Sequence, residues 1–132
     1  IFACGGSMFA SIVAAASAND ASVIGVDVDQ SYESDTVVTS ALKGLVSATE
    51  WAIDKFYSDS WAEVGDVATT LGANNDAVGL PTETWSLTKF TVEEYEALLA
   101  SIKDGTVALD NAALNNDEVV NAGLENVTII YE

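Results

Sequence analysis

Two carboxylates and a lysine are the residues of this chain whose types and spacing best fit ligand chemistry. Asp27 and Asp29 lie at the end of the largely apolar stretch 23–28, Gln30 follows them, and Lys43 comes shortly afterwards. An apolar stretch rich in β-branched residues predicts a buried strand. Ligands of open α/β sheets bind beyond the carboxyl ends of the strands, so these side chains are placed to hydrogen-bond a small polar molecule.

Each of these residues also has a purely structural interpretation. Asp27 could cap a helix or loop, and Asp29 and Gln30 could stabilise the loop that contains them. Lys43 could be an exposed lysine in the first turn of a helix, although a positive charge there opposes the helix dipole. Alternation along the strand turns Asp29 to the same side as Asp27, one step further out.

Composition excludes several classes of function. A chain of 132 residues with 49% apolar residues fits one modest domain with a core. The net charge of −17 comes from 21 acidic residues against four lysines and no arginine. This balance argues against nucleic acid as a partner, because phosphate binding needs a basic surface. The acidity indicates a well-solvated surface.

Cysteine and histidine usage narrows the chemistry further. The chain has one cysteine, Cys4, and no histidine. An internal disulfide and a cysteine-rich metal site are therefore excluded, and the usual general base is missing. We predict no catalytic residue, no metal and no cofactor, with Cys4 as a small buried apolar residue.

The first third of the chain predicts a strand–helix–strand unit. A strand at 1–4 leads through the Gly5-Gly6 turn into a helix, which Ser7 caps and residues 19–20 end, and the strand 23–28 follows. The helix face directed at the sheet comprises Met8, Phe9, Ile12, Val13 and Ala16.

The remaining elements continue the α/β alternation. An extended piece at 37–40 is followed by a helix at 42–57 and by a hairpin, in which 67–71 and 77–80 flank the turn 72–76. A capping box at Thr91–Glu94 then predicts a helix with Gly105 as its C-cap. Extended segments at 106–109 and 127–131 flank the irregular stretch 110–126.

Taken together, these motifs resemble the C-terminal part of the basic membrane protein family, the substrate-binding lipoproteins of ABC transporters. The resemblance rests on the strand into Gly5-Gly6, on Gly-Val-Asp-x-Asp-Gln at 25–30, on Ser-x-x-Lys at 40–43, and on the helix within 91–105. It is strongest over 1–52, moderate over 72–109, and fades beyond 111. The acidity departs from the basic character that the family name records.

The resemblance implies a fold. The expected architecture is an α/β three-layer sandwich of the periplasmic-binding-protein type I, with two Rossmann-like lobes, of which residues 1–132 form the C-terminal part. Residues 1–35 belong to one lobe, 36–40 are a hinge crossing, 41–90 belong to the other lobe, and 91–132 are a return segment and tail. We expect pairing with a missing N-terminal portion or with a second copy.

The resemblance also implies a ligand, a partner and a location. Characterised members bind purine nucleosides and deliver them to an ABC permease, without enzymatic activity. The protein would lie outside the cytoplasm, anchored to the cell membrane by a lipidated N-terminus absent from this chain. The aromatic residues that stack on the base would belong to the missing portion.

The family's ligand contacts carry over onto five residues. The backbone of Gly5 and Gly6 is expected to face the nucleoside, Asp27 to accept hydrogen bonds from the ribose hydroxyls, and Lys43 to help hold the ligand. Asp29 is a further candidate contact.

Other ligands and classes stay open. A glycine turn followed about 20 residues later by an acidic residue also outlines an NAD-binding Rossmann unit of an oxidoreductase. In this chain, however, Ser7 and Ala10 occupy the second and third glycine positions counted from Gly5, and Met8 would obstruct a pyrophosphate. A ligand-sensing regulatory domain of the same fold, and a sugar or other ribosylated ligand, are further alternatives.

Overall fold

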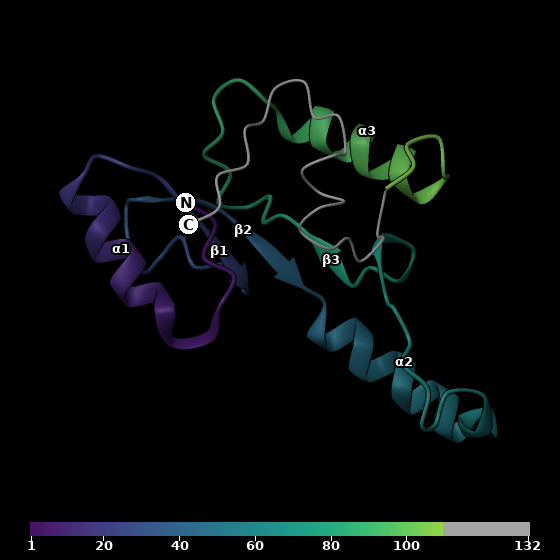
Figure 1. Ribbon diagram of the computed structural model, residues 1–132. Helices are drawn as coiled ribbons and strands as arrows, with labels where there is room; N and C mark the ends of the chain where they lie inside the picture. Colours follow the sequence, from purple (N-terminus) through teal and green to yellow (C-terminus); the bar gives the residue numbers. More distant parts are fainter. Residues whose placement is uncertain (110–132) are drawn as a thin grey trace, which may run out of the picture.

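A three-stranded open sheet organises the molecule. The computed structural model describes residues 1–109 of the chain, and the sheet has the order β1-β2-β3, with β1 at Val23–Asp27, β2 at Val37–Lys43 and β3 at Val78–Gly79 (Figure 1). β1 and β2 are parallel, whereas β2 and β3 are antiparallel. The α-helices are α1 at Phe9–Ala18, α2 at Leu45–Tyr57 and α3 at Val92–Lys103, and short 3₁₀-helices cover Gly6–Met8, Trp61–Glu63 and Ala73–Asn75.

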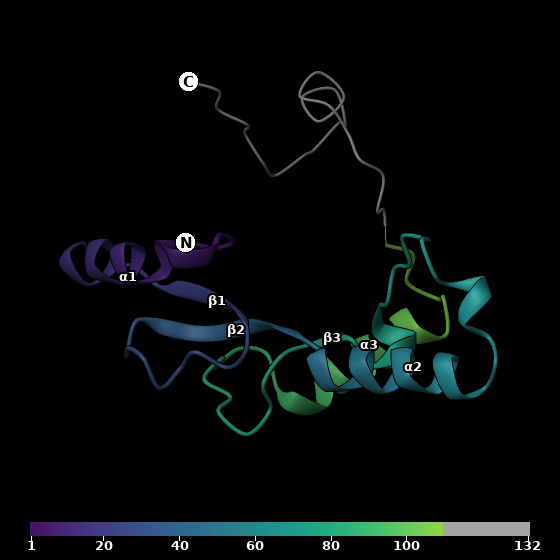
Figure 2. The same cartoon turned by 90° about the horizontal axis from the view of Figure 1, so that it is seen from below.

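The core lies between α1 and the start of the sheet. Four buried residues form it, namely Ala3, Ala16, Val23 and Val37, and Phe9, Ile12 and Val13 pack against them. Figure 2 shows α1 on one side of β1 and β2. The predicted apolar face of the first helix is therefore confirmed, except that Met8 is 55% exposed.

The first residues pair with β1 as predicted, but over a shorter length. Phe2 forms a parallel bridge with Ile24, and Ala3 N–H donates to the Ile24 carbonyl at 3.1 Å. The prediction that Cys4 is buried is wrong, because Ala3 points into the core and its neighbour Cys4 is exposed. Alternation along an extended segment turns adjacent side chains to opposite faces.

Ser7 does not cap the first helix. It lies inside the 3₁₀ turn Gly6–Met8, and the residue before α1 is Met8, which makes no side-chain capping bond. The end of the helix was predicted correctly, since α1 stops at Ala18 and Asn19 N–H donates to the Ala16 carbonyl.

β2 is longer than the sequence predicts, and α2 begins later. The predicted extended piece 37–40 continues to Lys43, so the helix expected from residue 42 starts at Leu45. Leu42 pairs with Asp27 on one side and with Gly79 on the other. These two sets of ladder bonds outweigh the intrinsic helix preference of Ala41, Leu42 and Lys43.

The predicted hairpin around 72–76 is wrong. Residues 67–71 form no strand, and β3 pairs with the end of β2 instead. Gly44 N–H donates to the Ala77 carbonyl at 2.8 Å, which brings the start of β3 to the β2–α2 junction. The predicted extended segment 106–109 is likewise not a strand.

The capping box before α3 is confirmed. Thr91 Oγ1 accepts from Glu94 N–H at 3.2 Å, and Glu94 Oε2 accepts from Thr91 N–H at 2.8 Å. Gly105 follows the helix with φ of 79°, the left-handed conformation that glycine adopts most easily. The predictions for 110–126 and 127–131 lie outside the described residues.

The expected α/β class is confirmed, as a mixed open sheet with flanking helices consistent with part of a periplasmic-binding-type fold. Figure 1 shows β2 running from the α1–β1 part toward the part that contains α2, β3 and α3. None of the helices within residues 1–109 is long and apolar enough to cross a membrane.

Candidate functional site

Asp27 and Lys43 meet at the carboxyl edge of the two parallel strands. Asp27 is the last residue of β1 and pairs with Leu42, so Lys43 comes one residue further along β2. Their side chains form an ion pair with 3.6 Å between Lys43 Nζ and Asp27 Oδ1. The structure thus brings together two of the five predicted site residues, at the edge where α/β sheets bind ligands.

This ion pair is open to solvent. The Asp27 side chain is 59% exposed and the Lys43 side chain 66% exposed. An exposed pair contributes little to stability, about 0–1 kcal/mol. Most of the carboxylate's lone pairs and the ammonium's N–H groups therefore remain available to a ligand.

Gly5 and Gly6 follow the strand-like segment next to β1. Gly5 and Asp27 each lie three residues beyond the parallel bridge between Phe2 and Ile24, so both come at the same edge of the sheet. Neither glycine has a positive φ. A Cβ on Gly5 would lie 2.7 Å from Met8 Sδ, whereas a Cβ on Gly6 would meet nothing within 4 Å.

Asp29 is engaged by the protein itself. Its Oδ1 accepts from Ser31 N–H at 3.0 Å and its Oδ2 accepts from Thr84 Oγ1 at 2.6 Å. The hydrogen bond from Thr84 is the main cause that lowers the pKa of the Asp29 carboxyl, and hydrogen bonds from Ser31 add to it against the opposing effect of burial.

Gln30 folds back onto β1. Its Oε1 accepts from Val26 N–H at 2.9 Å, and its own N–H donates to Oγ of the buried Ser40 at 3.0 Å. Glycine is required at position 25, because a Cβ there would lie 2.6 Å from Gln30 Oε1 and 2.7 Å from Ser40 Oγ. The loop-stabilising interpretation of Asp29 and Gln30 is therefore confirmed.

Sequence reasoning missed the residues that support this loop. Thr84 lies 55 residues from Asp29 in the chain, and no pattern in the sequence links the two. Gly25 and Ser40 belong to the motifs at 25–30 and 40–43, but the motifs do not indicate that these two residues support the loop. Lys43 was placed in a helix, although it ends a strand.

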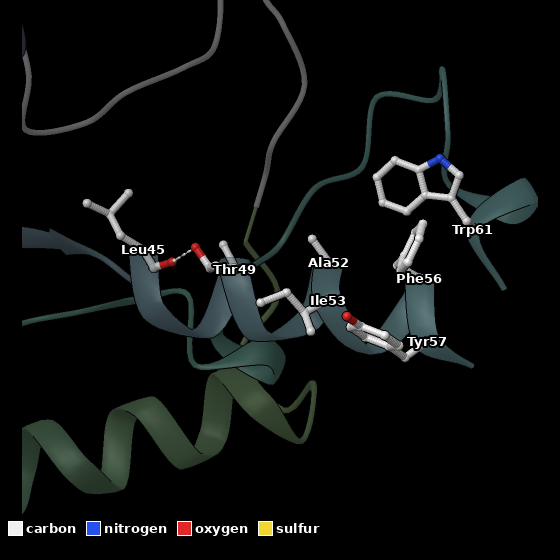
Figure 3. Close-up of a pocket in the computed structure, with 8 residues that line it drawn as sticks. Leu45, Thr49, Ala52, Ile53, Phe56, Tyr57 and Trp61 are labelled. Atoms are coloured by element: carbon white, nitrogen blue, oxygen red, sulfur yellow. Dashed lines mark hydrogen bonds between the residues drawn. The ribbon is translucent and has the colours of Figure 1, made fainter. Parts of the chain in front are cut away.

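A separate apolar hollow lies along α2, which begins two residues after Lys43. Its volume is about 510 Å³, and Figure 3 shows the side chains that line it, among them Leu45, Ala52, Ile53, Phe56, Tyr57 and Trp61. Its lining contains no charged side chain, and the Thr49 hydroxyl donates to the Leu45 carbonyl at 2.7 Å. The hollow suits the packing of an apolar surface better than the recognition of a polar ligand.

Comparison with protein families identifies the chain. The family model described as Bmp, ABC transporter substrate-binding protein PnrA-like, matches residues 1–113. The chain belongs to this family. The comparison with curated proteins gave no match.

Membership in the Bmp family fixes the general role. The chain is an ABC transporter substrate-binding protein, and such proteins act outside the cytoplasm and present a small molecule to a permease. The NAD-binding alternative is not favoured by this match. Within residues 1–109, no group of three or more potential metal-ligating side chains occurs.

Proposed function

We propose that this Bmp-family protein captures a nucleoside, with a purine nucleoside favoured, and releases it to its permease without chemical conversion. The observation that carries the proposal is the exposed ion pair between Asp27 and Lys43 at the carboxyl edge of parallel strands. A carboxylate there can accept from two vicinal ribose hydroxyls at once. Hydrogen bonds to a charged group contribute roughly 1.5–3 kcal/mol.

The other proposed contacts surround this pair. Lys43 donates to a ribose oxygen and keeps the Asp27 carboxylate oriented. The backbone of Gly5 and Gly6 approaches the nucleoside from the neighbouring segment, where the absence of side chains on both residues permits close contact. Asp29, whose two carboxylate oxygens accept from Ser31 and Thr84, holds the loop beside this pair.

We also propose that the protein binds its ligand between two lobes. Residues 1–35 belong to one lobe, 36–40 to a hinge crossing, 41–90 to the other lobe and 91–132 to a return segment and tail. β2 connects the two proposed lobes, since it pairs with β1 from Val37 to Leu42 and with β3 through Leu42 and Lys43. A hinge at this point would let closure of the lobes enclose the ligand.

A covering partner for α2 and a membrane anchor complete the proposal. The N-terminal portion of the same protein, or a second copy, packs on the exposed apolar face of α2, which buries none of its residues against the rest of 1–109. A lipidated N-terminus holds the protein at the outer face of the membrane. Mass spectrometry of the intact gene product would reveal both the length of the native chain and the lipid.

The ligand assignment is tested at Asp27. Asp27→Asn keeps the shape, removes the charge and converts half of the acceptor capacity into donors. Nucleoside binding is expected to weaken about ten- to a hundredfold, and binding of the 2′-deoxy analogue, which already lacks one hydroxyl, to weaken less. Calorimetry on full-length protein measures both, and Asp54→Asn on α2 is the control with the same chemical change.

Two results would contradict the assignment. Equal losses for ribose and deoxyribose ligands would show that Asp27 acts through the fold and not through the sugar. Release of a ligand without ribose from natively purified protein, identified by mass spectrometry, would replace the nucleoside with that ligand.

A further inference from the structure

Asp27 occupies a tight turn that residues other than glycine rarely adopt. Its φ is 68°, and Val28 N–H donates to the Val26 carbonyl at 2.8 Å, which closes a three-residue turn around it. Such γ-turns with positive φ are rare and strained. A strained residue persists only where its surroundings hold it in place, so the neighbouring contacts decide where the carboxylate points.

The first of these contacts comes from β1 and β2. Gln30 binds Val26 N–H through its side chain and the Ser40 hydroxyl through its backbone. Both bonds fold the chain after Asp27 back onto the sheet. They restrain the loop from the side of the strands.

The second contact comes from a distant part of the chain. Thr84, in the segment between β3 and α3, donates its hydroxyl to Asp29 Oδ2 at 2.6 Å. Within the part of the chain that the structure describes, this is the one hydrogen bond that joins residues 27–31 to that segment. The other Asp29 oxygen accepts from Ser31 N–H, so the carboxylate connects Thr84 to the backbone of the loop.

The segment that carries Thr84 is itself well anchored. Leu80 N–H donates to the Tyr95 hydroxyl at 2.9 Å, and Trp85 Nε1 donates to the Phe90 carbonyl at 2.8 Å. The ring of Trp85 lies against that of Tyr95, with 5.5 Å between their centroids. These contacts of Trp85 and Tyr95 hold the segment in place, and with it the Thr84 hydroxyl.

We propose that Thr84 is a positioning residue for ligand binding. Its hydroxyl holds Asp29, Asp29 holds the loop, and the loop keeps the strained Asp27 carboxylate directed at the ligand's hydroxyls. This inference rests on the proposed function for the role of Asp27. Thr84 is assigned no contact with the ligand, so its effect is expected on the ribose-dependent part of the affinity.

The test uses the full chain with two substitutions at position 84. Thr84→Val keeps the shape and removes the hydroxyl, whereas Thr84→Ser keeps the hydroxyl. Ser86→Ala is the matched control, because Ser86 also donates a hydroxyl bond of 2.6 Å from the same segment, but to the Val38 carbonyl of β2. Calorimetry with adenosine and 2′-deoxyadenosine measures binding, and amide hydrogen exchange at Val28 and Ser31 measures the loop without ligand.

The expected pattern separates positioning from general stability. Thr84→Val should weaken adenosine binding about fivefold, reduce the preference for adenosine over 2′-deoxyadenosine, and speed exchange at Val28 and Ser31. Thr84→Ser should restore all three properties to within about twofold of the wild type. Ser86→Ala should leave the nucleoside preference and the two exchange rates unchanged.

The opposite results would overturn the inference. If Thr84→Val lowers the melting temperature but leaves the nucleoside preference and the exchange rates unchanged, Thr84 is a structural residue only. If the wild type binds neither nucleoside, the proposed function fails. Hydrogen exchange at Val28 then still tests whether Thr84 positions the loop. Faster exchange in Thr84→Val than in the wild type supports this role, and an unchanged exchange rate refutes it.

Discussion

Apolar side chains are buried on the first strands of this protein but exposed on helix α2. Val23 and Val37 are 0% and 6% exposed, whereas Val46 and Phe56 on α2 are 71% and 61% exposed. The first region packs α1 against the sheet, and α2 buries no residue within 1–109. The first region therefore forms a core from its own residues, whereas the apolar face of α2 is left exposed within 1–109.

The candidate site lies with the self-contained region. Asp27 ends β1, whose Val23 and Gly25 are buried, and Leu42, the residue before Lys43, pairs with both β1 and β3. The geometry of the pair therefore depends on contacts that are already present in residues 1–109. Whatever covers α2 should affect the stability and assembly of the protein more than the arrangement of these two side chains.

The largest effect in the first region is expected for Gly25→Ala. The new methyl group would lie 2.6 Å from Gln30 Oε1 and 2.7 Å from the hydroxyl of the buried Ser40. Overpacking of this kind costs about 1–3 kcal/mol. Thermal unfolding should show a clear loss of stability, accompanied by weaker nucleoside binding because the Gln30 bond to Val26 is displaced.

Gly6→Ala is the matched control for this change. A methyl group on Gly6 meets nothing within 4 Å, and the φ of Gly6 is not positive, so the free energy of unfolding should change by no more than about 0.5 kcal/mol. Equal destabilisation by the two substitutions would show that the contact of Gln30 with Gly25 does not control the loop.

A pair of identical substitutions compares the two regions directly. Val23→Ala removes two methyl groups from a fully buried position and should cost about 2 kcal/mol, since it leaves a cavity. Val46→Ala on the exposed face of α2 should change the free energy of unfolding by no more than about 0.5 kcal/mol. Denaturant unfolding of both variants measures the contrast.

A large loss in the free energy of unfolding for Val46→Ala would contradict the contrast between the two regions. It would mean that α2 is covered in solution, as proposed for an N-terminal portion or a second copy. Repeating the measurement at two protein concentrations distinguishes these, because only stabilisation by a second copy depends on concentration.

Local patterns predicted much of the fold. The strand predicted at 23–28, which the structure ends one residue earlier at Asp27, the apolar face of α1 and the capping box at Thr91 follow from periodicity and from nearest neighbours in the chain. Such signals are contained within about a dozen residues, so they do not depend on the rest of the molecule.

Contacts between distant segments could not be predicted in this way. Residues 41–43 have good helix formers, yet pairing with β1 and β3 makes them a strand. The Asp29–Thr84 bond spans 55 residues and carries no sequence pattern. The family resemblance predicted that Asp27 and Lys43 both serve the ligand, but the strand register that places them side by side could not be predicted.

The smallest predicted effect concerns the pH dependence of stability at Asp29. Its pKa in the folded protein lies below the ordinary value of 3.8, chiefly because Thr84 donates to the carboxylate. A lowered pKa means that the stabilisation is fully present above the unfolded-state value and is lost as the pH falls through the folded-state value. The melting-temperature difference between wild type and Asp29→Asn should therefore be constant from pH 7 down to about pH 5 and shrink below about pH 4.

Thr84→Val provides the control for this pH dependence. Removing the hydroxyl removes the largest cause of the shift, so Asp29→Asn should have a smaller and flatter effect in the Thr84→Val background. Melting curves of the four proteins between pH 3 and pH 7 complete the double-mutant cycle. An Asp29→Asn effect that is identical in both backgrounds at every pH would show that the bond from Thr84 does not hold the charged carboxylate, and the loop after β1 would then be held by its local bonds, those of Ser31 to Asp29 and of Gln30 to Val26 and Ser40.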